Sequence, residues 1–397
     1  MQGFDFAYRP RIMFGPGISG RIGELAVEYG ASSVLLVSDP GVAAAGHADA
    51  VESALRDQRI AVHLFTGVRE NPTLADVNAC AAVARQHGPD LIVGLGGGSS
   101  LDVAKACAMV CAEGTDIARS PGMTASNRPH VPVIAIPTTA GTGSECQPHA
   151  VICDEETHAK VAFATSRSLP AVAVLDPVLT VTQPRKVTAD TASDAIVHAV
   201  EVWVTKPANP LSAMFAGEAF SLLTSNLPAV LAHPGDLEAR GHMQLGAAWA
   251  GLGIAHSMLG AAHAAGNALT ARYPISHGAA VASMLPAVIR FNSEDDAVRA
   301  RYATLAARSW LGSGLVPDGG DPADRERGLV GALLGMLSSL WSLTGHPPGL
   351  SGLGVRADDI GPLAVEAASQ RTGLFNPRPV GVAEFEALFT AALTAAP

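Results

Sequence analysis

Two patterns of apolar residues divide the chain. Up to about residue 184, short runs rich in Val, Ile and Leu alternate with longer stretches that have helical apolar spacing. Apolar runs between turn residues are typical of strands buried on both faces, and regular strand–helix alternation is typical of a parallel sheet. We predict an entry strand or hairpin within 1–15, strands at 34–37, 61–65, 91–95, 131–136 and 171–175, a hairpin over 149–163, and helices at 18–29, 48–58, 74–87 and 101–111.

Strand patterns end near residue 184, and helical spacing continues from there. The expected helices span 188–204, 211–231, 236–257, 259–270, 277–292, 296–309, 326–344, 357–370 and 382–395. A chain of 397 residues is too long for one ordinary core, so two domains are expected. We predict an α/β domain with a parallel sheet over 1–184 and an all-helical domain over 185–397.

Composition narrows the class of protein. The hydrophobic fraction of 48% is enough for large cores, and a charged fraction of only 16% argues against disorder. The net charge of −10 disfavours binding to nucleic acid or to an anionic membrane, and no apolar run reaches the length of a membrane span. The first residues lack the apolar core of a signal peptide, and the five cysteines form no CxxC pair. We therefore expect a cytoplasmic protein without a disulfide framework.

A carboxylate and three imidazoles are the strongest candidate for chemistry. Asp194 and His198 are four residues apart, so they share one face of a predicted helix. Downstream, His263 and His277 flank a short segment of small residues. A single histidine on a helix is more often a core residue, but four such groups are a ligand set suited to Fe²⁺ or Zn²⁺ and poor for Mg²⁺ or Ca²⁺.

Three further features suggest a nucleotide site. The run GGGSS (96–100) follows a predicted strand and opens a helix, an arrangement that lets backbone N–H groups bind a phosphate, although it is neither GxGxxG nor a P-loop. Asp39 ends an earlier strand, where a carboxylate can bind ribose hydroxyls or simply cap a helix. The segment PTTAGTGSE (137–145) offers hydroxyls at another strand end, or it is an ordinary polar loop.

Taken in order, the motifs GGGSxxDxAK, PTTAGTGSE, DxxxH and the paired downstream histidines resemble the iron-containing, group III alcohol dehydrogenases. The resemblance covers nearly the whole chain. It implies the dehydroquinate synthase-like fold of that family, with an N-terminal dinucleotide-binding α/β domain, a C-terminal helical metal-binding domain, and a nicotinamide cofactor in the cleft between them. It implies metal ligation by Asp194, His198, His263 and His277. The positions that it implies for NAD(H) are Asp39, Asn71, Gly97, Gly98, Ser99, Asp102, Thr138, Thr139, Thr142, Val151, Lys160 and Leu179.

The chain departs from the family pattern at one position. Many members carry a further histidine, often credited with proton relay, where this chain has Asn267. An amide does not titrate near neutral pH, so a proton must pass by water, a cofactor ribose hydroxyl or another side chain. His149 follows the polar loop, at a position that lines the substrate pocket in related enzymes. We predict that His149 and Asn267 face the substrate, with His149 either a proton relay or a pocket wall.

The expected activity is NAD(H)-dependent interconversion of an alcohol and an aldehyde or ketone. In this reaction the metal polarises the substrate oxygen while a hydride passes to or from the nicotinamide. The partners that we expect are a small-molecule substrate and further copies of the chain in a homodimer or higher homo-oligomer. The alternatives on the same fold are a maleylacetate-type reductase, a more remote dehydroquinate synthase-type lyase, and a metal- or nucleotide-binding protein without turnover.

Overall fold

The computed structural model describes residues 4–7, 9–114, 122–156, 160–308 and 321–394. The chain forms two compact units, one over Phe6–Gln183 and one that joins the residues before Phe6 with Pro184–Pro397, and each is described by itself. In the described residues, no helix combines the length and the apolar character needed to cross a bilayer.

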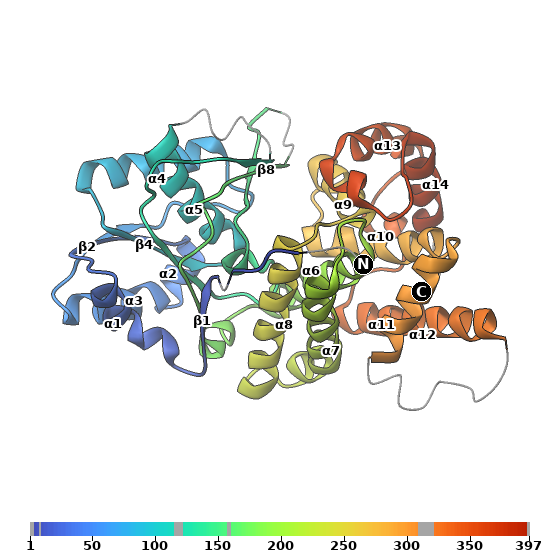
Figure 1. Cartoon of the computed structure of the whole chain (residues 1–397), viewed down its shortest axis with the longest axis horizontal. Coiled ribbons are helices and arrows are strands. Elements are labelled where there is room, and N and C mark those ends of the chain that lie inside the picture. The colour runs from blue at the N-terminus through green and yellow to red at the C-terminus, as the bar shows by residue number, and fades with distance from the viewer. Residues whose placement is uncertain (1–3, 8, 115–121, 157–159, 309–320, 395–397) are drawn as a thin grey trace. The chain divides into compact units, whose positions relative to one another are not determined.

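A six-stranded parallel sheet organises the first unit (Figure 1). Its strand order is β1-β9-β6-β4-β2-β3, and every pair in it is parallel. The strands are β1 (Arg11–Phe14), β2 (Ser33–Val37), β3 (Ala61–Phe65), β4 (Leu91–Gly96), β6 (Val133–Pro137) and β9 (Val172–Leu175). The predicted parallel α/β sheet is therefore confirmed. Within the predicted entry segment, the strand covers 11–14, and residues 1–3 and 8 lie outside the described part of the chain.

Helices cover both faces of this sheet. Leu36, Val93 and Ile134 are neighbours in register and face α1 (Ile22–Glu28) and α3 (His47–Asp57). On the other face, Leu35 and Ile92 pack with α4 (Leu74–His87) and α5 (Gly98–Glu113). Burial on both faces explains why these strands are continuously apolar instead of alternating.

Smaller elements complete the α/β unit. The strands β7 (Ala150–Cys153) and β8 (Lys160–Thr165) pair antiparallel, as the predicted hairpin requires, and β5 (Gly122–Thr124) adds to β8. The short helix α2 (Pro40–Ala44) was not predicted. Neither β5 nor α2 is long enough to leave a periodic pattern in the sequence.

The second unit is helical in its described residues. Its helices are α6 (Arg185–Val204), α7 (Pro210–Ala232), α8 (Leu237–Ala255), α9 (Ala261–Arg272), α10 (His277–Asn292), α11 (Asp296–Arg308), α12 (Pro322–Thr344), α13 (Ile360–Ser369) and α14 (Val382–Leu393). Polar caps set several starts. Asp321 caps α12 and Pro322 takes its first position, so this helix begins four residues before the predicted 326.

Candidate metal centre and cofactor site

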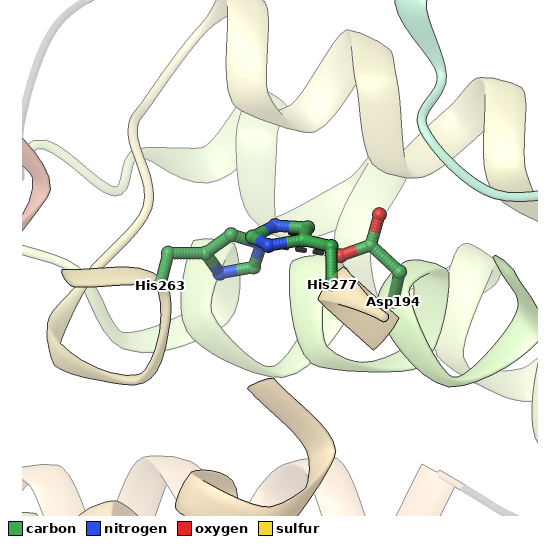
Figure 2. Close-up of side chains that lie close together, drawn as sticks. All are labelled: Asp194, His263 and His277. Carbon is green, nitrogen blue, oxygen red and sulfur yellow. Dashed lines mark ion pairs between the residues drawn. The ribbon is translucent and has the colours of Figure 1, made fainter. Parts of the chain in front are cut away.

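Three helices of the second unit bring the predicted metal ligands together. The long buried helix α6 carries Asp194 and His198 one turn apart, α9 carries His263 in its first turn, and α10 begins at His277. Figure 2 shows the imidazoles of His263 and His277 beside the carboxylate of Asp194. Residues from three separate segments thus meet at one point.

A single oxygen lies at the centre of this cluster. Asp194 Oδ1 is 3.4 Å from His198 Nε2, 3.3 Å from His263 Nε2 and 3.7 Å from His277 Nε2. Ligand atoms that are each about 2.1 Å from a tetrahedral ion are about 3.4 Å apart. One ligand atom each from Asp194, His263 and His277 also lies within 4.8 Å of the others. The positions of Asp194, His263 and His277 therefore fit a single transition-metal ion, whereas His198 lies outside this group of three although its Nε2 is close to the same carboxylate oxygen.

The electrostatics of the cluster also suit a cation. Burial raises the pKa of Asp194, but His198, His277 and His263 outweigh that effect and hold the pKa of the carboxyl well below its usual range. Burial lowers the pKa of His263, whereas Asp194 and Glu201 raise it to about 9. Among the described residues, the buried atoms Asp194 Oδ1 and His263 Nε2 have no hydrogen bond of acceptable geometry. Polar atoms so buried usually have a partner, and a divalent ion would supply one.

Close packing keeps α10 against α6. A Cβ added to Gly278 would lie 1.8 Å from the carbonyl oxygen of Asp190, which is one turn before Asp194. Only glycine allows this approach, and it holds the neighbouring His277 near the carboxylate. The close packing of α10 against α6 therefore explains why a glycine, Gly278, follows His277.

The cofactor motifs gather at the carboxyl ends of β2 and β4. From β2 the chain moves outward to β3, whereas from β4 it moves in the opposite direction to β6. Such a point, where the strand order reverses, is where open α/β sheets bind nucleotides. Asp39 follows β2, and Ser100 Oγ donates to its Oδ2 at 3.0 Å. The glycine turn and Asp39 therefore lie side by side at this point.

Asp39 also caps α2. Its Oδ1 accepts hydrogen bonds from the backbone N–H groups of Gly41 and Val42. The cap that we considered as the alternative is present, and it orients the carboxylate at the strand end without excluding a ribose contact through Oδ2.

The start of α5 lies against the threonine-rich loop. A Cβ on Gly97 would contact Thr139, and one on Gly98 would lie 2.6 Å from Thr142 Cγ2. The helix has no side-chain cap, so its first N–H groups stay available for an anion. Thr138 continues from β6 and donates its backbone N–H to Gly96 at 2.9 Å.

Asp102 and the buried Lys105 tie α5 to the following segment. Asp102 accepts hydrogen bonds from Ser144 Oγ at 2.6 Å and from Val151 N at 3.0 Å. Lys105 Nζ lies 3.1 Å from Asp102 Oδ1 and donates to the carbonyls of Ser144, at 3.1 Å, and of His149. Lys105 also reaches the carbonyl of Gln147. Both side chains thus position the loop, a role that sequence reasoning had not given to Lys105.

The other predicted cofactor positions lie in three places. Asn71 precedes α4, has a positive φ of 51°, and is close to the isolated bridge between Thr73 and Cys153. Lys160 begins β8 and pairs in register with Cys153, so it lies near the same segment. Ser99 is in the first turn of α5, and Leu179 contributes its side chain to the apolar core.

The two predicted substrate residues have local partners. Asn267 lies one turn after His263 on α9, and its amide donates to Gln370 Oε1 at 3.3 Å. His149 is partly buried just before β7, held through its carbonyl by Lys105. They belong to different units, so each is considered only in its own surroundings.

Sequence reasoning missed Glu201. It lies seven residues after Asp194 and three after His198, so the spacing places it on the same face of α6. Its Oε2 is 2.7 Å from His263 Nδ1. The motif DAIVHAVE contained the signal, since the third acidic or imidazole residue at helical spacing is visible in it.

Ser193, His346 and Asp190 resemble a hydrolase triad without its chemistry. Ser193 Oγ is 2.9 Å from His346 Nε2, and His346 Nδ1 is 3.8 Å from Asp190 Oδ1. The serine is fully buried and donates to Ala189 O, and the His–Asp distance is too long for a hydrogen bond. This cluster therefore holds α6 in place and has no exposed nucleophile.

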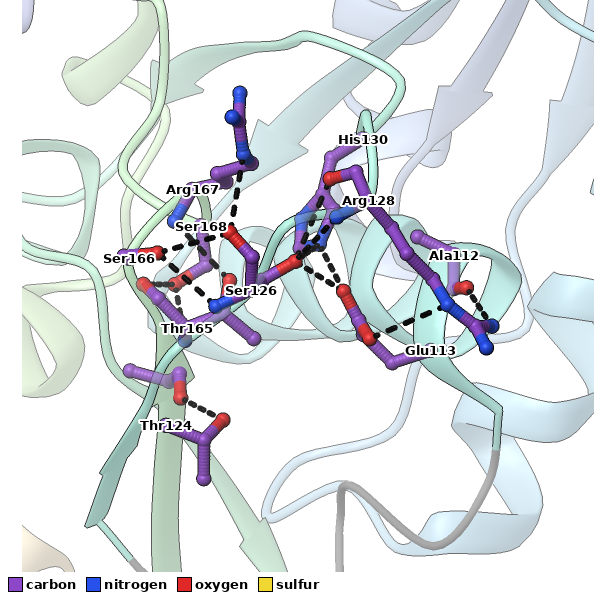
Figure 3. Close-up of polar contacts among 11 residues, drawn as sticks. Ala112, Glu113, Thr124, Ser126, Arg128, His130, Thr165, Ser166, Arg167 and Ser168 are labelled. Atoms are coloured by element: carbon purple, nitrogen blue, oxygen red, sulfur yellow. Dashed lines mark hydrogen bonds and ion pairs between the residues drawn. The ribbon is translucent and has the colours of Figure 1, made fainter.

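A further polar cluster lies at the opposite end of α5 (Figure 3). Ser126 donates to Glu113 Oε1, and His130 Nε2 is 3.1 Å from the same oxygen. Arg167 Nε donates to Ser126 O at 3.3 Å. A helix from Gly98 to Glu113 is about 24 Å long, so these contacts anchor the 122–130 segment far from the glycine turn.

Comparison with known proteins finds the same family in both halves of the chain. Residues 9–177 match the iron-containing alcohol dehydrogenase family, and residues 188–393 match the C-terminal part of the Fe-containing alcohol dehydrogenase family. The chain is 33% identical to Alcohol dehydrogenase 4 of Schizosaccharomyces pombe over 381 residues, which are 96% of this chain and 87% of that protein. It is 32% identical to the NAD-dependent methanol dehydrogenase of Bacillus methanolicus, over 98% of this chain and 100% of that protein.

A solved structure is also similar to this chain along nearly its whole length. The crystal structure of a 1,3-propanediol oxidoreductase superposes with a TM-score of 0.91 at 32% identity, covering 99% of this chain and 100% of that chain. The fold class and the family resemblance that the motifs predicted are confirmed. The protein belongs to the iron-containing alcohol dehydrogenase family and is an alcohol dehydrogenase.

Proposed function

We propose that the protein is a metal-dependent NAD(H) oxidoreductase whose metal ligands are Asp194, His198, His263 and His277. The observation that carries this proposal is the approach of three imidazole Nε2 atoms to Asp194 Oδ1 at 3.3–3.7 Å. One carboxylate and three imidazoles suit Fe²⁺ or Zn²⁺. When bound, the ion supplies Lewis-acid stabilisation of the substrate oxygen, and the nicotinamide supplies or accepts the hydride.

For the cofactor, we propose that the start of α5 binds the pyrophosphate. The free N–H groups at Gly98 and Ser99 and the positive end of the helix dipole support this assignment. Asp39 would accept a hydrogen bond from the adenosine ribose and disfavour the extra phosphate of NADP. Asn71, Asp102, Thr138, Thr139, Thr142, Val151, Lys160 and Leu179 complete the proposed site, with Asp102 acting through Ser144 and Val151.

For the substrate, we propose a small alcohol and its aldehyde or ketone. The relatives named above act, by their names, on methanol and 1,3-propanediol. Asn267 would hydrogen-bond a substrate oxygen on exchanging its contact with Gln370. His149 stays our candidate for the proton relay or the pocket wall.

We also propose a homodimer or higher homo-oligomer in the cytoplasm. Exposed aromatic side chains near the N-terminus support self-association, since Phe6 and Phe14 are each 44% exposed. All five cysteines are free thiols, which supports a reducing compartment.

The test combines metal analysis with turnover. The purified protein is assayed for bound iron and zinc, and then for oxidation of NADH and NADPH with a panel of aldehydes and for the reverse reaction with alcohols. We expect one metal ion per chain, NADH preferred, and loss of both metal and activity in His263→Ala.

His242→Ala is the matched control, because His242 is another helical histidine, its Nδ1 lies 3.2 Å from Asn226 Oδ1, and it is not one of the proposed ligands. It should keep both metal and activity. Full activity in the metal-free protein, or turnover restricted to an unsaturated dicarboxylate such as maleylacetate, would overturn the proposal.

A further inference from the structure

We infer that Glu201 is a positioning residue of the metal centre. In this role it holds the imidazole of His263 with Nδ1 as the hydrogen-bond donor and leaves Nε2 to bind the ion. The inference rests on the proposed metal site and adds to it a residue that does not touch the ion.

Three donors converge on the Glu201 carboxylate. Its Oε2 accepts from Gly260 N at 2.9 Å and lies 2.7 Å from His263 Nδ1, and its Oε1 accepts from Ala262 N at 2.7 Å. The side chain is buried, with 2% of the residue exposed. All three donors belong to the first turn of α9 or to the residue before it. A buried carboxylate is stable only with such partners, and the N-terminal end of a helix favours an anion.

The contact selects one form of His263. A carboxylate accepts hydrogen bonds, so Nδ1 carries the hydrogen and Nε2 of the neutral ring keeps its lone pair. That Nε2 lies 3.3 Å from Asp194 Oδ1, at the centre of the cluster. With the hydrogen on Nε2 instead, the ring would donate to Asp194 and could not bind the ion. Histidine ligands in proteins commonly have such a partner, and its loss typically weakens metal binding 10–100-fold.

The local packing leaves space for this carboxylate and little else. A Cβ on Gly260 would lie 3.0 Å from Glu201 Oε1 and 3.2 Å from Asn376 Oδ1. Asn376 is also buried and also receives a bond from this helix start, from Ala261 N at 3.4 Å. The side-chain hydrogen bonds of Asn376 in the described part of the chain go to Ala261, Asn292 and Arg378. Comparing Asn376 with Glu201 therefore separates support of α9 from orientation of His263.

The charge balance agrees with this role. Asp194 and Glu201 together offset the charge of a divalent ion, one by contact and one through His263. Since both come from α6, at positions seven residues apart, one helix carries both charges. Moving the carboxylate away from His263 should therefore weaken the metal site even if the helix survives.

The experiment measures metal binding directly. Wild type, Glu201→Gln and Asn376→Ala are stripped of metal, and their affinity for Zn²⁺ is measured by competition with a chromophoric chelator. The Co²⁺-loaded proteins are compared by their d–d absorption spectra, and thermal unfolding is recorded with and without Zn²⁺. Glutamine keeps the size of the side chain but has only one acceptor atom for three donors.

We expect Glu201→Gln to bind Zn²⁺ 10–100-fold more weakly and to shift the Co²⁺ spectrum. Asn376→Ala should lower the melting temperature of the metal-free protein and leave the affinity within twofold and the spectrum unchanged. Glu201→Asp retains the charge but is one methylene shorter, so it should show the same loss. It replaces Glu201→Gln if that variant does not fold.

Two results would overturn the inference. One is a Glu201→Gln protein that is less stable but binds Zn²⁺ as tightly as wild type with the same Co²⁺ spectrum, which would make Glu201 only a helix cap. The other is failure of both Glu201 variants to fold while Asn376→Ala folds. A wild type that binds no metal would instead refute the proposed metal centre, so the two failures are distinct.

Discussion

Adding a single methyl group at Gly278 should disrupt the metal centre from outside it. In Gly278→Ala the new Cβ would lie 1.8 Å from Asp190 O, and ordinary contact needs at least 3.4 Å. The α6 and α10 backbones must therefore separate by about 1.6 Å, because the atom met belongs to the main chain and no rotamer relieves the clash. Overpacking of this kind costs about 3 kcal/mol of unfolding free energy.

The same displacement should remove a ligand. His277 precedes Gly278 at the start of α10, and metal–ligand distances tolerate only about 0.2 Å. We expect Zn²⁺ affinity to fall at least about 100-fold, which is about 2.7 kcal/mol. Urea unfolding of the metal-free protein measures the first effect, and chelator competition measures the second.

Gly331→Ala is the control for a glycine-to-alanine change in a helix. Gly331 lies in α12, and a Cβ there meets nothing within 4 Å. That variant should be more stable by up to about 1 kcal/mol, since alanine has the higher helix propensity. A Gly278→Ala protein with unchanged stability and full metal content would refute the packing argument.

Three more outcomes follow from the site. Asp39→Gly should raise the use of NADPH relative to NADH in steady-state assays, and a wild type that already prefers NADPH would contradict this expectation. The same variant loses the α2 cap and the contact with Ser100, so its free energy of unfolding should be lower by about 1 kcal/mol. Burial raises the pKa of Glu145 from 4.5 to about 7, so between these pH values the native state holds a proton that the unfolded state has lost. The free energy of unfolding should therefore fall by up to ~3 kcal/mol as pH rises from 4.5 to 7. Glu145→Gln should flatten this part of the profile of urea midpoint against pH, and an unchanged slope would argue against the role of Glu145. Removing metal with a chelator should lower the melting temperature, and adding Zn²⁺ should restore it in wild type but not in His263→Ala.

Periodicity predicted the main strands and helices well because long elements repeat one pattern many times. The strand β3 and the helices α4 and α10 have the predicted bounds. The errors occur where local chemistry overrides the pattern. Helix α5 starts at Gly98, three residues before the predicted 101, because glycine and serine carry no apolar signal there. Short elements such as α2 give too few residues for any period.

The residues of the candidate site also include some that sequence spacing could predict and others that it could not. Helical spacing was sufficient to group Asp194 with His198, and the same rule extended by three residues would have included Glu201. No spacing rule links α6 with His263 and His277, since only the three-dimensional fold brings the three helices together. The role of Lys105 was hidden for a similar reason, because its partners other than Asp102 are main-chain carbonyls, which leave no mark in the sequence.

Those carbonyl contacts of Lys105 bear on how the enzyme can acquire new substrates. Every residue has a carbonyl, so the tether at Ser144, Gln147 and His149 does not depend on which side chains the loop carries. The Gln147 side chain adds one bond of its own, from Nε2 to the carbonyl of Thr142 at 3.1 Å, so a mutation at 147 removes that bond but leaves the Lys105 tether in place. A library randomised at position 149 should yield mostly folded variants, with altered substrate preference if His149 is a pocket wall, whereas the same library made on Lys105→Met should yield mostly unfolded protein.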